Sequence, residues 1–226
     1  MAAAIAPRQL VLALDHAESF AREDFIVGDS NVAALALVER WPDWSDSILV
    51  LAGGEGAGKS HLASIWAEQV GARILAARSL DQADLPGAFA TGALVVEDIS
   101  PDTDERALFH LLNMAREERT SVLLTARSAP AGWVLTLPDL GSRLRALPVV
   151  QIAPPDEGLL RALIIKLAAD RQIAVDEALV NYLSNRIERS FSGVRAAVAA
   201  LDHEAMRQQR PVTRPLAVEI FGNRST

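Results

Sequence analysis

Residues 53–60 read Gly-Gly-Glu-Gly-Ala-Gly-Lys-Ser and match the phosphate-binding loop (P-loop) pattern G-x-x-x-x-G-K-[ST]. The apolar run at 48–51 precedes the loop and predicts a buried strand, and residues 61–67 after it are compatible with a helix. Glycines let the backbone curl so that several N–H groups point at phosphate oxygens, and a helix N-terminus adds a favourable potential. The motif therefore predicts a strand–loop–helix unit that binds a nucleotide.

Individual side chains of this loop have distinct expected roles. Lys59 would reach the β- and γ-phosphates, and Ser60 would supply an oxygen ligand to Mg²⁺. The other residues expected to contact the nucleotide are Gly53, Gly54, Glu55, Gly56, Ala57, Gly58 and His61. A glycine-rich turn without a ligand is the alternative, and the flanking strand and helix argue against it.

The composition narrows the functional classes. With 226 residues, of which 50% are hydrophobic, the chain is long enough for a large buried core. It contains no cysteine, which excludes disulfides and thiolate metal sites, and no run of about 18 apolar residues that would predict a membrane span. The net charge of −7 disfavours tight binding to the DNA backbone. We therefore expect a cytoplasmic protein without membrane association or tight nonspecific DNA binding. Sequence-specific DNA binding is not expected either, because no helix-turn-helix segment follows the C-terminal helices.

Apolar segments alternate with helix-compatible segments through residues 30–153. Besides the strand at 48–51, we expect strands at 72–76, 93–96, 121–125 and 149–152, a helix at 31–40 capped by Ser30, and a helix from after Asp104 through 116. Continuous rather than alternating hydrophobicity in the strands indicates that helices cover both sheet faces. The pattern predicts an α/β fold with a parallel-sheet core.

Two consecutive prolines, Pro154 and Pro155, mark the end of this core because they remove N–H donors and disfavour helix in the preceding residue. Beyond them the chain reads as helical at 156–170, 176–187, 192–210 and from 213. We therefore predict an extended arm at residues 1–20, an α/β core at 21–153, and a small all-helical lid domain at 154–226.

Glu97 and Asp98 end the third apolar strand and form a candidate Walker B motif. Carboxylates at this point would hold the water shell of a metal or polarise an attacking water. We expect their strand to neighbour the P-loop strand, so that both acids and Ser60 share one Mg²⁺. A pair of exposed acids at a strand end, without a metal, is the alternative.

Five short motifs keep their order and spacing along residues 22–221. They are Phe25-Ile26-Val27-Gly28-x-x-Asn31, Gly58-Lys59-Ser60-His61-Leu62, Glu97-Asp98-Ile99, Ser142-Arg143 and Ser192-Gly193-Val194-Arg195. In this order they resemble the successive boxes of DnaA, the bacterial replication initiator and an AAA+ protein. The resemblance implies that Ile26 contacts the nucleotide, that Arg143 is an arginine finger acting in trans, and that Arg195 is a sensor 2 arginine on a lid helix. Arg145 is the alternative finger.

The N-terminal arm carries a second pattern. Glutamine followed by alternating leucines, at Gln9, Leu10, Leu12 and Leu14, resembles the short peptide by which bacterial proteins dock on the replicative sliding clamp. An extended segment can place apolar side chains in a pocket while the glutamine amide makes directional hydrogen bonds. An ordinary edge strand or the start of an amphipathic segment is the alternative.

The lid is followed by no helix-turn-helix segment up to Thr226. With the arm and the five motifs, this makes the chain similar to the Hda family, regulators that inactivate DnaA after initiation. The resemblance implies a protein that holds ADP or ATP with Mg²⁺, docks on the DNA polymerase sliding clamp, and stimulates ATP hydrolysis by DnaA through Arg143. The resemblance does not define the oligomeric state, and a homodimer is one alternative.

Hydrolysis at the chain's own site is expected to be weak. The first Walker B position, usually Asp, is Glu97 if Asp98 aligns with the second acid, and the extra methylene moves the carboxylate relative to the metal. Asp98 is then the candidate catalytic acid. Two alternatives stay open, a helicase-loader ATPase of the DnaC kind and an autonomous P-loop ATPase or kinase, and rapid turnover without a partner would favour the second.

Overall fold

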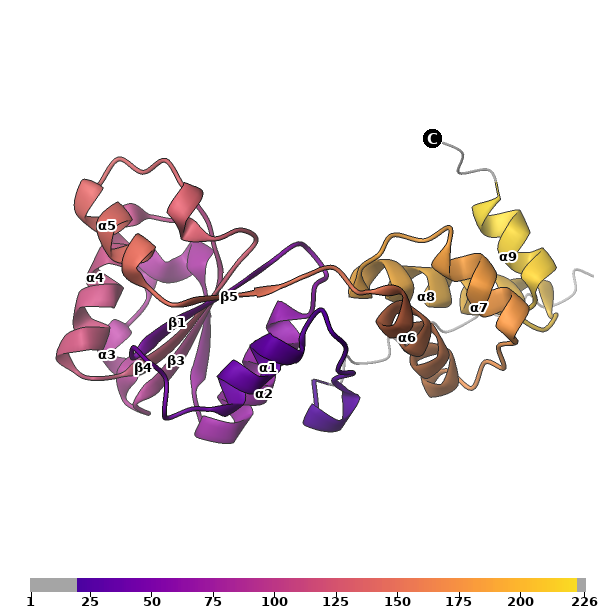
Figure 1. Cartoon of the computed structure of the whole chain (residues 1–226), viewed down its shortest axis with the longest axis horizontal. Coiled ribbons are helices and arrows are strands. Elements are labelled where there is room, and N and C mark those ends of the chain that lie inside the picture. The colour runs from indigo at the N-terminus through magenta and orange to yellow at the C-terminus, as the bar shows by residue number, and fades with distance from the viewer. Residues whose placement is uncertain (1–19, 223–226) are drawn as a thin grey trace, which may run out of the picture.

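The computed structural model describes residues 20–222, so the predicted clamp-binding residues Gln9, Leu10, Leu12 and Leu14 lie outside the described part. Five strands form one parallel sheet in the order β2-β3-β4-β1-β5 (Figure 1). Their bounds are β1 Ile48–Gly53, β2 Arg73–Ala76, β3 Ala93–Ile99, β4 Ser121–Ala126 and β5 Val149–Ile152. The expected strands and the parallel α/β core are confirmed.

Helices cover both faces of this sheet. They are α1 Val32–Glu39, α2 Lys59–Val70, α3 Leu85–Phe89, α4 Glu105–Glu117 and α5 Pro138–Ala146. Alternate residues of β1 enter two different cores: Ile48 and Val50 pack with α3, α4 and α5, whereas Leu49 and Leu51 pack with α1 and α2. A strand buried on both sides must be apolar at every position, which explains the unbroken hydrophobic runs.

The carboxylate-bearing strand β3 does not neighbour β1, contrary to the expectation from the sequence. Strand β4 lies between them and pairs with both. After β1 the chain forms β2 at the edge of the sheet and β3 next to it, and β4 then inserts between β3 and β1. The packing of the crossover connections sets such a strand order, and no single segment encodes it. A side chain of β4 is therefore placed between the P-loop and Glu97-Asp98.

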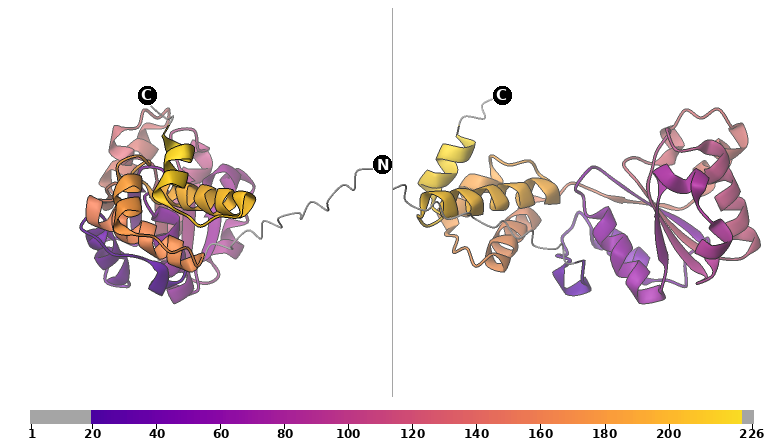
Figure 2. Two further views of the ribbon diagram at one scale, coloured as in Figure 1. Left: turned by 90° about the vertical axis from the view of Figure 1, so that its right-hand side faces the viewer. Right: turned by 180° about the vertical axis from the view of Figure 1, so that it is seen from behind.

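Four further helices form the C-terminal lobe, which Figures 1 and 2 show beside the sheet lobe. They are α6 Glu157–Asp170, α7 Glu177–Ser184, α8 Phe191–Gln208 and α9 Arg214–Phe221. Their buried side chains form a core of their own, with Leu160, Leu183 and Leu201 among its members. Aspartates cap two of these helices: Asp156 accepts from the Leu159 N–H and Asp176 from the Leu179 N–H. The lid is all-helical, as predicted.

Several local predictions need correction. Ser30 does not cap the first helix, because Asn31 occupies the N-cap position, and the Ser30 hydroxyl is buried without a hydrogen-bond partner within residues 20–222. The side chain of Asn31 instead turns back, accepting from the Gly28 N–H at 2.9 Å and donating to the Ile26 carbonyl at 2.9 Å. Helix α7 ends at Ser184, three residues earlier than expected, and helices α3 and α5 were not predicted.

The two lobes are joined by more than the β5–α6 connection. The Ala153 N–H donates to the Ser30 carbonyl at 3.1 Å, and an added Cβ at Gly28 would lie 3.0 Å from the Leu159 Cβ on α6. Lys166 of α6 donates to the Asp24 carboxylate at 2.6 Å. The hydrogen bond to Asp24 is the main reason why the pKa of Lys166 is raised, and the hydrogen bond to Asp170 raises the pKa further. The short segment before α1 thus contacts both lobes.

None of the helices within residues 20–222 combines the length and the hydrophobicity needed to span a bilayer.

Candidate functional site

The P-loop joins the end of β1 to the start of α2, as its sequence predicts. Two of its glycines have left-handed backbone, with φ of 65° at Gly56 and 96° at Gly58, which other residues adopt at a cost. Between them Ala57 is buried in the core beneath α2. The loop therefore curls over a fixed base, and Gly54 and Glu55 remain exposed.

Lys59 lies inside this curl. The residue is 6% exposed, and its Nζ donates to the carbonyls of Gly53 and Gly54, both at 2.9 Å. Burial is the main cause that lowers the pKa of the Lys59 ammonium; the Asp98 carboxylate is the largest opposing influence, and Arg127 adds to the lowering. The ammonium is held at the mouth of the loop by neutral carbonyls, which a ligand with stronger negative charge can replace.

The start of α2 completes an arrangement that fits a phosphate group. No side chain caps this helix at Gly58, so its first N–H groups have no side-chain acceptor. Ser60 is exposed at the first turn. Uncapped N–H groups, the helix dipole and a buried lysine at one point form a strong anion site, and the hydroxyl of Ser60 is available as an oxygen ligand.

The lid helix α8 begins directly on the P-loop. The Phe191 N–H donates to the Gly56 carbonyl at 2.8 Å, and the Phe191 ring would lie 3.5 Å from a Cβ added at Gly58. Ser192 faces Gly56, and Arg195 follows one helical turn later on the same side of α8. Burial lowers the pKa of the Arg195 guanidinium. The structure thus brings the predicted sensor 2 segment next to the phosphate-binding loop.

The Walker B candidates sit at an irregular strand end. Strand pairing between β3 and β4 shifts between Val96 and Ile99, and Asp98 has a positive φ of 58°. Glu97 is half-buried and Asp98 exposed, and both carboxylates act on the pKa of Lys59. Within residues 20–222 no cluster of three or more His, Cys, Asp or Glu side chains could hold a metal by itself. A Mg²⁺ ion at this site would need phosphate and water oxygens besides Ser60, Glu97 and Asp98.

Two residues of the site were not predicted. Thr125 is fully buried at the end of β4, and its hydroxyl accepts from the Asp98 N–H at 2.9 Å, so it fixes the backbone of the acidic pair. Arg127 follows two residues later and pairs with Glu55 at 3.3 Å, with both side chains largely exposed. The signal for Thr125 was its place as a polar residue after the apolar run Val122–Leu124, near the end of the strand.

Ile26 and His61 lie near the loop but have partners of their own. The Nε2 atom of His61 lies 3.0 Å from the Ala21 carbonyl, and its ring meets the edges of Phe20 and Phe25. Ile26 packs against the lid core, and its carbonyl is held by Asn31. His61 thus anchors the segment before α1, and Ile26 stays a predicted nucleotide contact.

Arg143 lies on α5, on the opposite face of the sheet from α2. Its guanidinium carbon is 4.9 Å from the centre of the Phe109 ring of α4, and among the described residues it has no ion-pair partner. Arg145, the alternative finger, is exposed and donates to the Ser142 hydroxyl at 3.2 Å. Stacking on an aromatic ring orients a guanidinium while leaving its N–H groups available to an acceptor.

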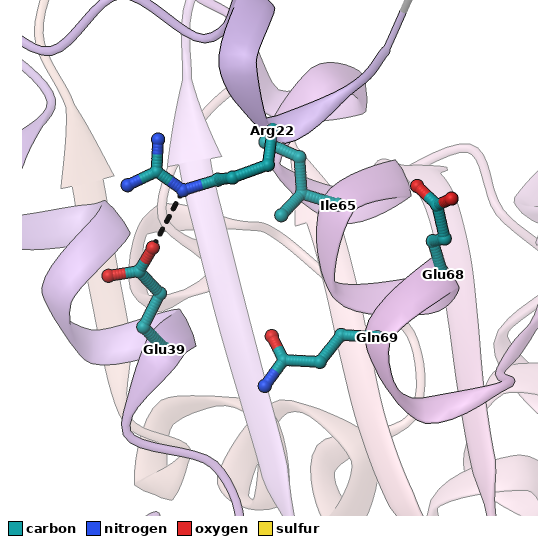
Figure 3. Close-up of a pocket in the computed structure, with 5 residues that line it drawn as sticks. All are labelled: Arg22, Glu39, Ile65, Glu68 and Gln69. Carbon is teal, nitrogen blue, oxygen red and sulfur yellow. Dashed lines mark hydrogen bonds and ion pairs between the residues drawn. The ribbon is translucent and has the colours of Figure 1, made fainter.

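A separate pocket of about 270 Å³ lies where α1, α2 and the residues before α1 meet (Figure 3). Arg22 and Glu39 reach toward each other across it and form an ion pair at 2.8 Å, while Glu68 and Gln69 line the α2 side. The only cation in its lining is therefore already paired, and the pocket is not part of the phosphate site.

The contact between lid and P-loop can be tested at Gly56. A Cβ there would lie 2.1 Å from the Ser192 hydroxyl, and the backbone is left-handed, which costs an L-residue about 1–2 kcal/mol. We expect Gly56→Ala to lower the melting temperature by roughly 5 °C, measured by differential scanning calorimetry. Gly54→Ala is the matched control, because an added Cβ at Gly54 meets nothing within 4 Å. Adding Ser192→Ala should recover part of the loss, and equal melting temperatures for the two glycine variants would refute the contact.

Comparisons with known proteins agree with this arrangement. Residues 156–221 match the model of the Hda lid domain family. The chain is 25% identical over 233 residues to an uncharacterized protein of Haemophilus influenzae, covering 95% of this chain and 98% of that protein. The structure of the present chain resembles domain III of the Thermotoga maritima replication initiation protein DnaA, with a TM-score of 0.73 and 17% identity. The match covers 90% of this chain and 96% of that one.

DnaA of Aquifex aeolicus in its AMPPCP-bound form is also similar, with a TM-score of 0.66, 17% identity, and coverage of 83% of this chain and 68% of that one. At these identities the likeness to the solved structures defines the fold. The lid segment therefore matches the Hda lid domain family, and the sheet lobe and lid together have the fold of domain III of DnaA.

Proposed function

We propose that this protein is a negative regulator of replication initiation. In this proposal it binds ADP or ATP with Mg²⁺, docks on the sliding clamp through its N-terminal arm, and stimulates ATP hydrolysis by DnaA. The observation that carries the proposal is the seating of an Hda-type lid on a P-loop, through the hydrogen bond from Phe191 to the Gly56 carbonyl.

The nucleotide would lie between the two lobes. Lys59, the uncapped N–H groups of α2 and the curled loop would hold its phosphates, and Arg195 would approach them from the lid. Mg²⁺, when bound, would neutralise phosphate charge, with Ser60 as ligand and Glu97 and Asp98 holding its water shell. Because lid residues and loop residues meet at this point, the bound nucleotide would stabilise one angle between the lobes.

Arg143 would act on the nucleotide of DnaA rather than on the chain's own. Its place on α5, across the sheet from α2, supports action in trans, and its stacking on Phe109 supports a guanidinium oriented before the partner arrives. A guanidinium placed on phosphate charge stabilises the transition state of phosphoryl transfer. A homodimer is compatible with the proposal but is not required by it.

The proposal is tested by reconstitution. Purified chain with ADP, clamp loaded on DNA, and ATP-bound DnaA should hydrolyse ATP much faster than DnaA with the clamp alone, measured as release of labelled phosphate. The chain by itself should turn over well below about 1 s⁻¹. Fast turnover without DnaA would instead support an autonomous ATPase.

The arm supplies the control for this experiment. Replacing both Gln9 and Leu10 by alanine should abolish retention on immobilised clamp and the clamp-dependent part of the stimulation, because it removes the directional amide and one apolar contact. Affinity for ADP, measured by calorimetry, should stay unchanged. Full retention of the double variant on the clamp would exclude the arm as the docking segment.

A further inference from the structure

A pocket of about 390 Å³ opens on the lid, far along the chain from the P-loop residues. Helices α7 and α9, which pack side by side in the lid, supply most of its wall (Figure 1). It is lined by Ala178, Asn181, Tyr182, Asn185, Arg186 and Arg214. The volume is within the range of small-ligand sites, and the lining contains two cations and no carboxylate.

The two arginines converge on a single aromatic ring. The guanidinium carbons of Arg186 and Arg214 lie 5.7 Å and 5.9 Å from the centre of the Tyr182 ring. Neither forms an ion pair with any carboxylate of residues 20–222, whereas nearby Arg161 pairs with Glu177 and Arg210 with Glu219. Both guanidiniums therefore lie beside one ring, and in a chain of net charge −7 they leave a local positive site.

Other donors surround this charge. The Tyr182 hydroxyl is buried and lacks a hydrogen-bond partner within the described chain. The Asn181 side-chain oxygen accepts from Arg161, so its NH₂ group is the end that can donate to a ligand. Helix α9 begins at Arg214 with no side-chain cap from Thr213, so the Arg214 N–H has no side-chain acceptor, whereas the next residue, Pro215, carries no N–H. The pocket is therefore rich in donors, although the Asn185 amide donates to the Asn181 carbonyl and so presents its oxygen as an acceptor.

We propose that this lid pocket binds a phosphate group, at a site distinct from the P-loop. Two planar guanidinium forks and additional N–H and O–H donors match an anion with three or four acceptor oxygens better than a carboxylate with two. The phosphate could belong to a free phosphate compound or to a nucleic-acid strand, since both present the same oxygens. The site does not depend on the proposed regulatory function.

Tyr182 is the only tyrosine of the sequence, so it provides a specific probe. Protein labelled with 3-fluorotyrosine should give a single ¹⁹F resonance, which inorganic phosphate should shift with saturation at a dissociation constant of about 1 mM or tighter. The titration is made at constant ionic strength in the Lys59→Ala background, which weakens phosphate binding at the P-loop. The double variant Arg186→Ala/Arg214→Ala should raise the dissociation constant by roughly 10-fold or more.

Arg207→Ala is the matched control, because Arg207 is an exposed lid arginine on α8 that pairs with Glu204, and it should leave the titration unchanged. A parallel titration with oligothymidylate identifies the source: saturation by both ligands indicates a general phosphate site, and saturation by the oligonucleotide alone indicates a strand. A resonance that does not respond to either, that responds equally to chloride, or that responds only to a glutamate-rich peptide would overturn the proposal. An unaltered response in the double variant would overturn it as well.

Discussion

Replacing Arg143 by alanine is expected to reduce the stimulated ATP hydrolysis of DnaA by about 10³-fold or more, which is the usual effect of removing an arginine finger. The fold should be retained, because Arg143 is only half-buried, forms no ion pair within the described residues, and loses only its stacking on Phe109, a contact of about 1 kcal/mol. Retention on the clamp and affinity for ADP should also remain normal. The measurement is single-turnover hydrolysis of labelled ATP bound to DnaA.

Two further variants make this result specific. Arg145→Ala removes a neighbouring exposed arginine on the same helix and should leave stimulation intact, since its guanidinium is directed to Ser142. Arg143→Lys keeps the charge but loses the planar fork, and should recover little activity. If Arg145→Ala abolishes stimulation while Arg143→Ala retains it, the finger has been assigned to the wrong residue.

Lys59→Ala is expected to weaken ADP binding by about 100-fold, measured by isothermal titration calorimetry, because a charge-assisted contact to the phosphates is lost. The buried ammonium is also the group that bridges the Gly53 and Gly54 carbonyls, so the loop loses its internal support in the absence of ligand. Stabilisation of the fold by excess ADP, seen as a rise in melting temperature, should shrink accordingly.

The control for the lysine is Gln69→Ala, which changes an exposed residue near the other end of α2 and should leave ADP affinity unaltered. An affinity of Lys59→Ala within about two-fold of the unaltered protein would mean that the nucleotide is held elsewhere. Because DnaA is stimulated only by the nucleotide-bound protein in our proposal, the same variant should also lose most of its regulatory activity.

The strands and the P-loop were predictable because each rests on a local signal. Apolar runs such as residues 93–96 are continuous because a central strand is buried on both faces, and the glycines of the P-loop are required by its left-handed turns. The lid helices were predictable for a similar reason, since Asp156 and Asp176 each begin a helix with a direct cap.

What the sequence did not reveal depends on long-range packing. Helix α5 contains Gly141 and two arginines in nine residues, and it is a helix because Leu140 and Leu144 are buried against the sheet. Thr125 joins the site only because β4 inserts between β1 and β3, an order that no segment encodes alone. The lid pocket was likewise invisible, since Tyr182 and Arg214 are 32 positions apart and meet only after α7 and α9 pack.

The ion pair between Lys166 and Asp24 links the lid to the segment before α1. Asp24 lies four residues beyond Phe20, where the described chain begins, and Lys166 is part of the lid. His61, on the helix that starts at the P-loop, contacts the same short segment before α1 through the Ala21 carbonyl. Rotation of the lid away from the sheet lobe would have to break the Lys166–Asp24 contact or the His61–Ala21 contact, so these two contacts together oppose separation of the lobes.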